Sequence, residues 1–195
     1  MQVITINGQI RKDLGKKGAK AVRDQEQIPC VLYGGDEVVH FSTTPADVRH
    51  LIYSADFKIA EVVVDGKPFK CILKDKQFHP VTDAILHLDF LRLVDDQPVK
   101  VEVPLRFKGT AAGVKAGGKL LQKLRTVKIK TIPQKLVDEI NLDVSHLELG
   151  QSVRVRDIAA IEGVEILNSL SIPVATIEIP RALRSAAQAE AAGKK

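Results

Sequence analysis

Short hydrophobic runs with a two-residue period dominate the first half of the chain. Residues 3–10 (VITINGQI) alternate between apolar and polar positions, which predicts a strand with one buried face, and Gly8 marks a possible break or bulge. The turn Asp65-Gly66 predicts a hairpin between two alternating runs. The two strands of this hairpin are residues 58–64 and 67–73, and two further strands of the first half are predicted at residues 30–35 and 84–93.

Two segments of the first half are predicted to contain helices. Residues 11–27 begin as a glycine-bearing loop and continue as a short helix that places Lys16, Lys20 and Arg23 on one face. Residues 44–55 predict a second helix, since Thr44 can cap it and Pro45 suits the first helical position. The predicted inward stripe of this helix is Val48, Leu51, Ile52 and Ala55.

The second half consists of alternating runs separated by turn-rich pieces, which predicts a mostly antiparallel β domain with one solvated face. Polarity rises at residues 94–98 (VDDQP), so we place the domain limits at 1–94 and 95–181. The Ala-rich tail, 182–195, lacks core-forming residues and is expected to be flexible. The runs predicted as strands are residues 99–107, 126–132, 139–144, 152–158 and 173–179.

Charge is distributed unevenly along the chain. The 195 residues carry 29 Lys and Arg against 24 Asp and Glu, a formal net charge of +5, and 45% of them are hydrophobic, as a globular core requires. Between Gln9 and Arg23 there are six Lys or Arg residues and one Asp, a local excess of +5. Such a segment is typical of a phosphate-binding surface, and a solvated basic face remains an alternative interpretation.

A histidine and an aspartate lie two residues apart in the predicted strand LHLDF. Alternation places His87 and Asp89 on one face and Leu88 and Phe90 on the other. Phosphate repels a carboxylate, so near RNA Asp89 has to accept from a base amino group or a ribose hydroxyl, while His87 can donate, accept or stack. The pair therefore suits reading of an RNA groove or loop, with an ordinary solvated strand face as the alternative.

Catalytic motifs are incomplete in this sequence. Residues Gly113 to Lys119 match the first seven positions of a phosphate-binding P-loop, but Leu120 stands where Ser or Thr must bind Mg²⁺. His79, His87 and Asp89 are metal-ligand types in a spacing that matches no metal motif. We therefore predict no enzyme activity, no metal and no cofactor.

Cys30 and Cys71 lie far apart in apolar sequence, which predicts two buried, reduced thiols. The sequence shows no secretory signal and no apolar run of the roughly 20 residues that a membrane span needs. We therefore expect a cytoplasmic protein without membrane contact.

Two ordered signatures resemble those of a known family. The run from Arg11 through Gly15, Lys20 and Arg23, followed by Ile28-Pro and Tyr33-Gly, resembles the N-terminal signature of the bacterial 5S-RNA-binding protein of the large ribosomal subunit, number twenty-five in the standard series. The segment LKDKQFHPVTDAILHLDF resembles the second signature of this family. The second half is similar to the extra domain of its long form, also called general stress protein CTC.

This resemblance implies a fold and a set of partners. The expected fold is mainly β with a few short helices: an N-terminal six-stranded antiparallel β-barrel and a C-terminal antiparallel domain of the β-roll or sandwich type. The implied partners are 5S ribosomal RNA, bound chiefly through its minor groove, and neighbouring large-subunit components, with a monomer expected off the ribosome. Lys20 stands where Arg is common in the family, which keeps the charge but loses the planar fork. The implied RNA contacts are Arg11, Lys16, Lys20, Arg23, Tyr33, His87 and Asp89, with Gln77 as a further candidate.

Three other functions remain open from the sequence alone. The same surface would serve a general RNA-binding stress protein that acts off the ribosome. A metal-dependent hydrolase would use His79, His87 and Asp89. A protein-interaction module would act mainly through the second domain.

Overall fold

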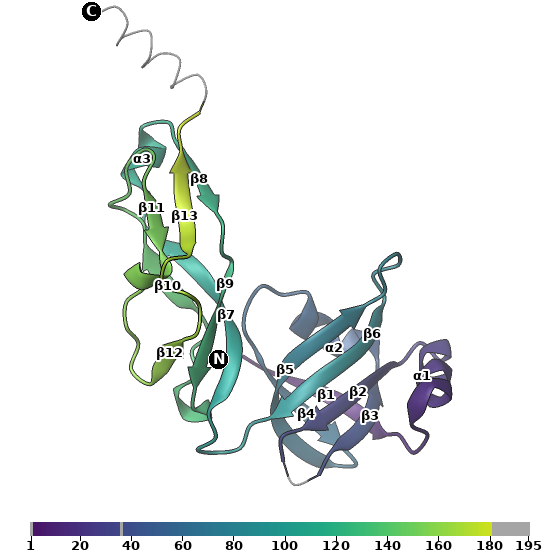
Figure 1. Cartoon of the computed structure of the whole chain (residues 1–195). Coiled ribbons are helices and arrows are strands. Elements are labelled where there is room, and N and C mark those ends of the chain that lie inside the picture. The colour runs from purple at the N-terminus through teal and green to yellow at the C-terminus, as the bar shows by residue number, and fades with distance from the viewer. Residues whose placement is uncertain (1, 36, 181–195) are drawn as a thin grey trace, which may run out of the picture. The chain divides into compact units, whose positions relative to one another are not determined.

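The computed structural model describes residues 2–35 and 37–180, which form strands, turns and three short α-helices (Figure 1). These residues divide into two compact units. One comprises the described residues up to Val101 together with Thr131–Asp138, and the other comprises Glu102–Lys130 and the described residues from Glu139 onward. The domain limits inferred from the sequence stay a prediction. The tail predicted to be flexible, 182–195, lies outside the described residues.

Six strands of the first unit close into a barrel in the order β1-β3-β2-β6-β5-β4 (Figure 1). The mainly β fold and the six-stranded barrel are therefore confirmed. All strands predicted for this half are present, and β3 is one that the sequence pattern did not reveal. The strands are β1 (Val3–Ile10), β2 (Ile28–Tyr33), β3 (Val39–Thr43), β4 (Ile59–Val64), β5 (Lys67–Phe78) and β6 (Ile85–Arg92).

The barrel is not wholly antiparallel, and this detail of the prediction is wrong. β1 runs parallel to β4, with Ile6 beside Val62, and β2 runs parallel to β6, with Leu32 beside Phe90. Parallel neighbours need long connections, which the intervening strands and helices provide here. Side chains alternate between faces in both kinds of pairing, so the hydrophobic pattern does not distinguish them.

Apolar side chains from the alternate positions of these strands fill the barrel. Phe41 and Phe90 are fully buried, and their ring centroids lie 5.7 Å apart. Gly8 does not interrupt β1: a Cβ atom at this position would lie 2.6 Å from the Phe41 ring. The glycine therefore makes room for the Phe41 ring, and the predicted break is wrong.

Both cysteines point into this core and form no disulfide. Cys30 and Cys71 are fully buried, as predicted. Burial raises the pKa of both thiols, that of Cys71 to about 12, because the thiolate would lose its hydration. Both are therefore expected to be unreactive in the folded protein.

Two helices flank the barrel. Helix α1 (Gly15–Asp24) presents exposed Lys16, Lys20 and Arg23, and a Cβ atom on Gly18 would collide with the Asp13 carbonyl oxygen. This glycine therefore allows the helix to lie against the loop that precedes it.

No helix in the described part of the chain is both long and apolar enough to cross a membrane.

Helix α2 (Pro45–Ile52) begins as predicted. The Thr44 Oγ1 accepts a hydrogen bond from the Asp47 backbone N–H at 3.4 Å, and Val48, Leu51 and Ile52 are buried. Ala55 is exposed beyond the end of this helix, so its predicted place in the inward stripe is wrong.

The second unit contains two sheets, which supports the predicted C-terminal β domain. One sheet has the order β10-β7-β9-β12 and the other β11-β13-β8. Pairing is antiparallel in the three-stranded sheet, whereas β7 and β10 are parallel, a departure from the predicted antiparallel domain. The elements from Val99 onward are β7 (Val99–Lys108), α3 (Ala112–Lys115), β8 (Lys119–Gln122), β9 (Thr126–Thr131), a 3₁₀ turn (Pro133–Lys135), β10 (Ile140–Asp143), β11 (Ser152–Arg154), a second 3₁₀ turn (Val155–Asp157), β12 (Val164–Ile166) and β13 (Pro173–Glu178).

The glycine-rich segment of this unit does not have the local structure of a P-loop. A P-loop connects a strand to the N-terminus of a following helix. Here Lys119 and Leu120 enter strand β8, and the four-residue helix α3 comes before the last two glycines. The match in sequence is therefore confined to spacing.

Candidate nucleic-acid interface

The barrel register joins one row of residues on its outer surface, which begins with Arg11 just after β1 and crosses β3, β2, β6 and β5. The Arg11 backbone N–H donates to the His40 carbonyl oxygen at 2.9 Å, and His40 pairs with Val31. Val31 pairs with Asp89 across β2 and β6, and Asp89 pairs with Asp75 across β6 and β5. Directly paired residues project to the same side of a sheet, and their chain neighbours, such as Leu88 and Phe90, fill the core. We call these five residues the outer row.

His87 and Asp89 form a close hydrogen-bonded pair on this face. The distance from His87 Nδ1 to Asp89 Oδ1 is 2.7 Å, and the two side chains are 28% and 30% exposed. Since a carboxylate only accepts, Nδ1 carries the proton and Nε2 faces away from the pair. Gln77 pairs with His87 across β5 and β6, so its amide shares this face. The arrangement offers a histidine nitrogen, a carboxylate and an amide within a small area.

Tyr33 belongs to the same face, two residues after Val31 on β2. Burial raises the pKa of its hydroxyl, and the nearby carboxylates of Asp89 and Asp75 raise it further. The phenol therefore stays protonated at neutral pH and can donate a hydrogen bond. Its ring is half-buried and offers a flat surface for stacking.

A hydrogen bond near the C-terminal end of helix α1 attaches the helix to this face. The Arg23 Nε donates to the carbonyl oxygen of Leu86 at 3.1 Å, and Leu86 precedes His87 in β6. The helix also lies beside β2, which carries Tyr33 (Figure 1). The exposed amines of Lys16 and Lys20 are therefore on an element that is held against the outer face.

Arg11 connects the other end of α1 to the barrel. Its Nη2 donates to the Asp13 carbonyl oxygen at 3.3 Å, while its Nε is buried without a hydrogen-bond partner among the described residues. A buried donor without an acceptor costs about 1–3 kcal/mol.

The structure thus brings together the residues that the resemblance implied. The strand residues share the outer face by register, and the Arg23–Leu86 hydrogen bond holds helix α1, which carries Lys16 and Lys20, against the barrel. His40 and Asp75 also join this face, although the sequence did not indicate them, because strand pairing cannot be derived from one sequence. We define the candidate RNA surface as Arg11, Lys16, Lys20, Arg23, Tyr33, Gln77, His87 and Asp89.

The metal-ligand types noted in the sequence are engaged in other interactions. The His79 Nδ1 accepts from the backbone N–H groups of Val81 and Thr82 at 3.4 and 3.2 Å, whereas His87 is paired with Asp89. Within residues 2–35 and 37–180, no three His, Cys, Asp or Glu side chains are grouped as a metal site.

Comparison with known proteins identifies both halves of the chain. The family model described as Ribosomal L25p family matches residues 6–90, and that described as Ribosomal protein TL5, C-terminal domain, matches residues 98–181. Both are models of ribosomal proteins.

The chain belongs to the ribosomal L25p family. The large ribosomal subunit protein bL25 of Cytophaga hutchinsonii is 44% identical over 195 residues, the full length of both chains. The proteins of the same name from Bacteroides fragilis and Porphyromonas gingivalis are each 43% identical, over 91% and 96% of this chain and 89% and 98% of their own lengths. The family is structural and not enzymatic, which confirms the prediction that the chain is not an enzyme.

Proposed function

We propose that this chain binds 5S ribosomal RNA through the candidate RNA surface. Its family membership makes it a structural constituent of the large ribosomal subunit, and thus of cytoplasmic ribosomes. The RNA partner and the contact residues are the finer part of the proposal.

The observation that carries the proposal is the attachment of a basic helix beside a polar strand face. The hydrogen bond from Arg23 to Leu86 holds the last cation of α1 beside the residue that precedes His87 in β6. Cations alone would bind any polyanion, and a carboxylate alone would be repelled by phosphate. Together they suit a ligand whose negative backbone lies close to hydrogen-bond donors.

An RNA minor groove has this combination. It is wide and shallow, and it displays 2′-hydroxyls and base edges between two rows of phosphates. Lys16, Lys20 and Arg23 would pair with phosphates, and Asp89 would accept from a base amino group or a ribose hydroxyl. His87 would present Nε2 to the groove, while Tyr33 and Gln77 would donate at its edges. Arg11 would pair with a phosphate through the part of its guanidinium that reaches the surface.

Competitive binding tests this proposal against a general RNA-binding stress protein. Full-length protein is titrated into labelled 5S ribosomal RNA at physiological salt, with either unlabelled 5S RNA or an unrelated structured RNA as competitor. The proposal requires 5S RNA to compete at least about 10-fold better, since nonspecific binding rests mainly on phosphate charge. Equal competition would favour the stress protein instead.

The remaining partner assignments are part of the same proposal. The second unit is proposed to contact neighbouring components of the large subunit, and the free protein is proposed to be a monomer. Light scattering of the purified chain tests the monomer directly. The proposed first domain, residues 1–94, contains all six barrel strands and the whole candidate RNA surface, so it should retain the RNA affinity of the full chain.

A further inference from the structure

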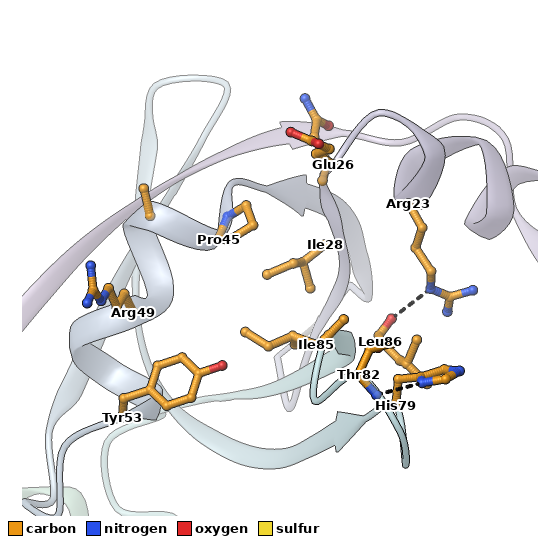
Figure 2. A pocket seen from close by; sticks show the side chains of 13 residues that line it. Arg23, Glu26, Ile28, Pro45, Arg49, Tyr53, His79, Thr82, Ile85 and Leu86 are labelled. Atoms are coloured by element: carbon orange, nitrogen blue, oxygen red, sulfur yellow. Dashed lines mark hydrogen bonds between the residues drawn. The ribbon is translucent and has the colours of Figure 1, made fainter.

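A cavity of about 700 Å³ opens in the first unit, at the end of the barrel where β2 and β6 begin. Figure 2 shows Arg23, Leu86 and His79 on one side of the cavity and, on the other, Arg49 of helix α2 and Tyr53, which directly follows this helix. Ile28 and Ile85 lie between these two sides. The cavity volume falls in the range of about 300–1,000 Å³ that is typical of small-molecule sites.

The cavity lining combines three kinds of side chain. These are the planar rings of Tyr53 and His79, the guanidiniums of Arg23 and Arg49, and the apolar side chains of Ile28 and Ile85. Tyr53, a residue 65% exposed, points the hydroxyl end of its ring toward Ile85, and Arg49 stands four residues earlier, on α2. Glu26 is the one carboxylate among the lining residues. A ligand that fits has a planar aromatic part for the rings and a negative group for the guanidiniums.

His79 is held so that it presents a donor. Its Nδ1 accepts from the backbone N–H groups of Val81 and Thr82, so the proton of the neutral ring sits on Nε2. The hairpin between β5 and β6 thereby fixes the orientation of the imidazole at the edge of the cavity. A donor in this place suits a base or phosphate oxygen.

The cavity is continuous with the candidate RNA surface. Arg23 lines the cavity and also donates to Leu86, a second lining residue that precedes His87 in β6. A chain of nucleotides on the outer face of β6 would therefore reach the cavity without leaving the protein surface.

We propose that this cavity receives a single unstacked nucleotide of the bound RNA, with its base against Tyr53 and its phosphate between Arg49 and Arg23. The proposal rests on the RNA-binding function above and extends it by a second contact. Stacking on aromatic side chains is the usual way in which proteins hold unpaired bases.

The test measures binding of full-length variants to labelled 5S ribosomal RNA at fixed salt. Tyr53→Ala removes the ring and should weaken binding at least about 5-fold, which is the lower end of base stacking. Tyr53→Phe keeps the ring and should bind like the parent. Arg49→Gln should weaken binding more than Lys70→Gln, which removes the same charge from the outer face of β5, where Lys70 pairs with Glu61.

The cavity proposal and the RNA-binding proposal fail in different ways. If the parent binds and His87→Ala weakens binding, but Tyr53→Ala and Arg49→Gln bind like the parent, only the cavity proposal is overturned. The same holds if these two variants bind RNA normally but no longer enter the large subunit, because the cavity would then receive a protein partner. A parent that does not bind 5S RNA overturns both.

Discussion

Replacing His87 by alanine separates RNA recognition from folding. The His87–Asp89 pair is about one-third exposed, so its loss should change the free energy of unfolding by less than about 1 kcal/mol. A direct contact to a base or ribose is worth about 1–3 kcal/mol, so the affinity for 5S RNA should fall by about 5- to 150-fold. The variant also leaves Asp89 without its partner, and this adds to the loss when RNA brings phosphates close.

The assay is equilibrium binding of labelled 5S RNA, repeated over a range of salt concentrations, together with thermal unfolding of each variant. Because His87 is not proposed to neutralise a phosphate, the salt dependence of binding should keep its slope while the whole curve shifts to weaker affinity. If His87→Ala binds like the parent at every salt concentration, the role assigned to the His87–Asp89 pair is refuted.

Three further changes test other parts of the structure. Lys16→Ala should lower the slope of the salt dependence by about 0.7–0.9, the value for one phosphate contact, whereas Lys70→Ala should not, and the two titrations are compared directly. Gly8→Ala should destabilise the barrel by about 1–3 kcal/mol, because the new methyl group would lie against Phe41, and urea unfolding measures this; an unchanged midpoint would contradict the packing. Because burial raises the pKa of Cys71 from 9.0 to about 12, its thiol favours folding below pH 9, and this contribution should be lost as the pH rises toward 12; stability measured over this range should fall less in Cys71→Ala.

Local features of the fold could be predicted because they depend on residues close in sequence. Thr44 and Pro45 start helix α2 as their chemistry requires, and alternation in LHLDF places His87 and Asp89 outside and Leu88 inside. These patterns need no knowledge of the rest of the chain.

Features that depend on strand pairing could not be predicted in this way. His40 joins the outer row because β3 pairs with β2, and Asp75 joins it through β6, and neither partner follows from the local sequence. Tyr53 and His79 are 26 residues apart in the sequence, and they line one cavity only in the closed barrel. The eight residues of the candidate RNA surface could be named in advance because the family resemblance supplied them.

Helix α1 and the outer face of β6 are proposed to form one surface that contacts 5S RNA. Directed cleavage of the RNA tests it, because both native cysteines are buried and a single new cysteine can carry an iron chelate that generates hydroxyl radicals. One probe is placed at Lys20→Cys on α1, and the control is placed at Thr5→Cys, exposed on β1, which is three positions from β6 in either direction around the barrel. We predict cleavage of 5S RNA from the Lys20→Cys probe and little or none from Thr5→Cys. Equal cleavage from both sites, or cleavage from Thr5→Cys alone, would contradict the account.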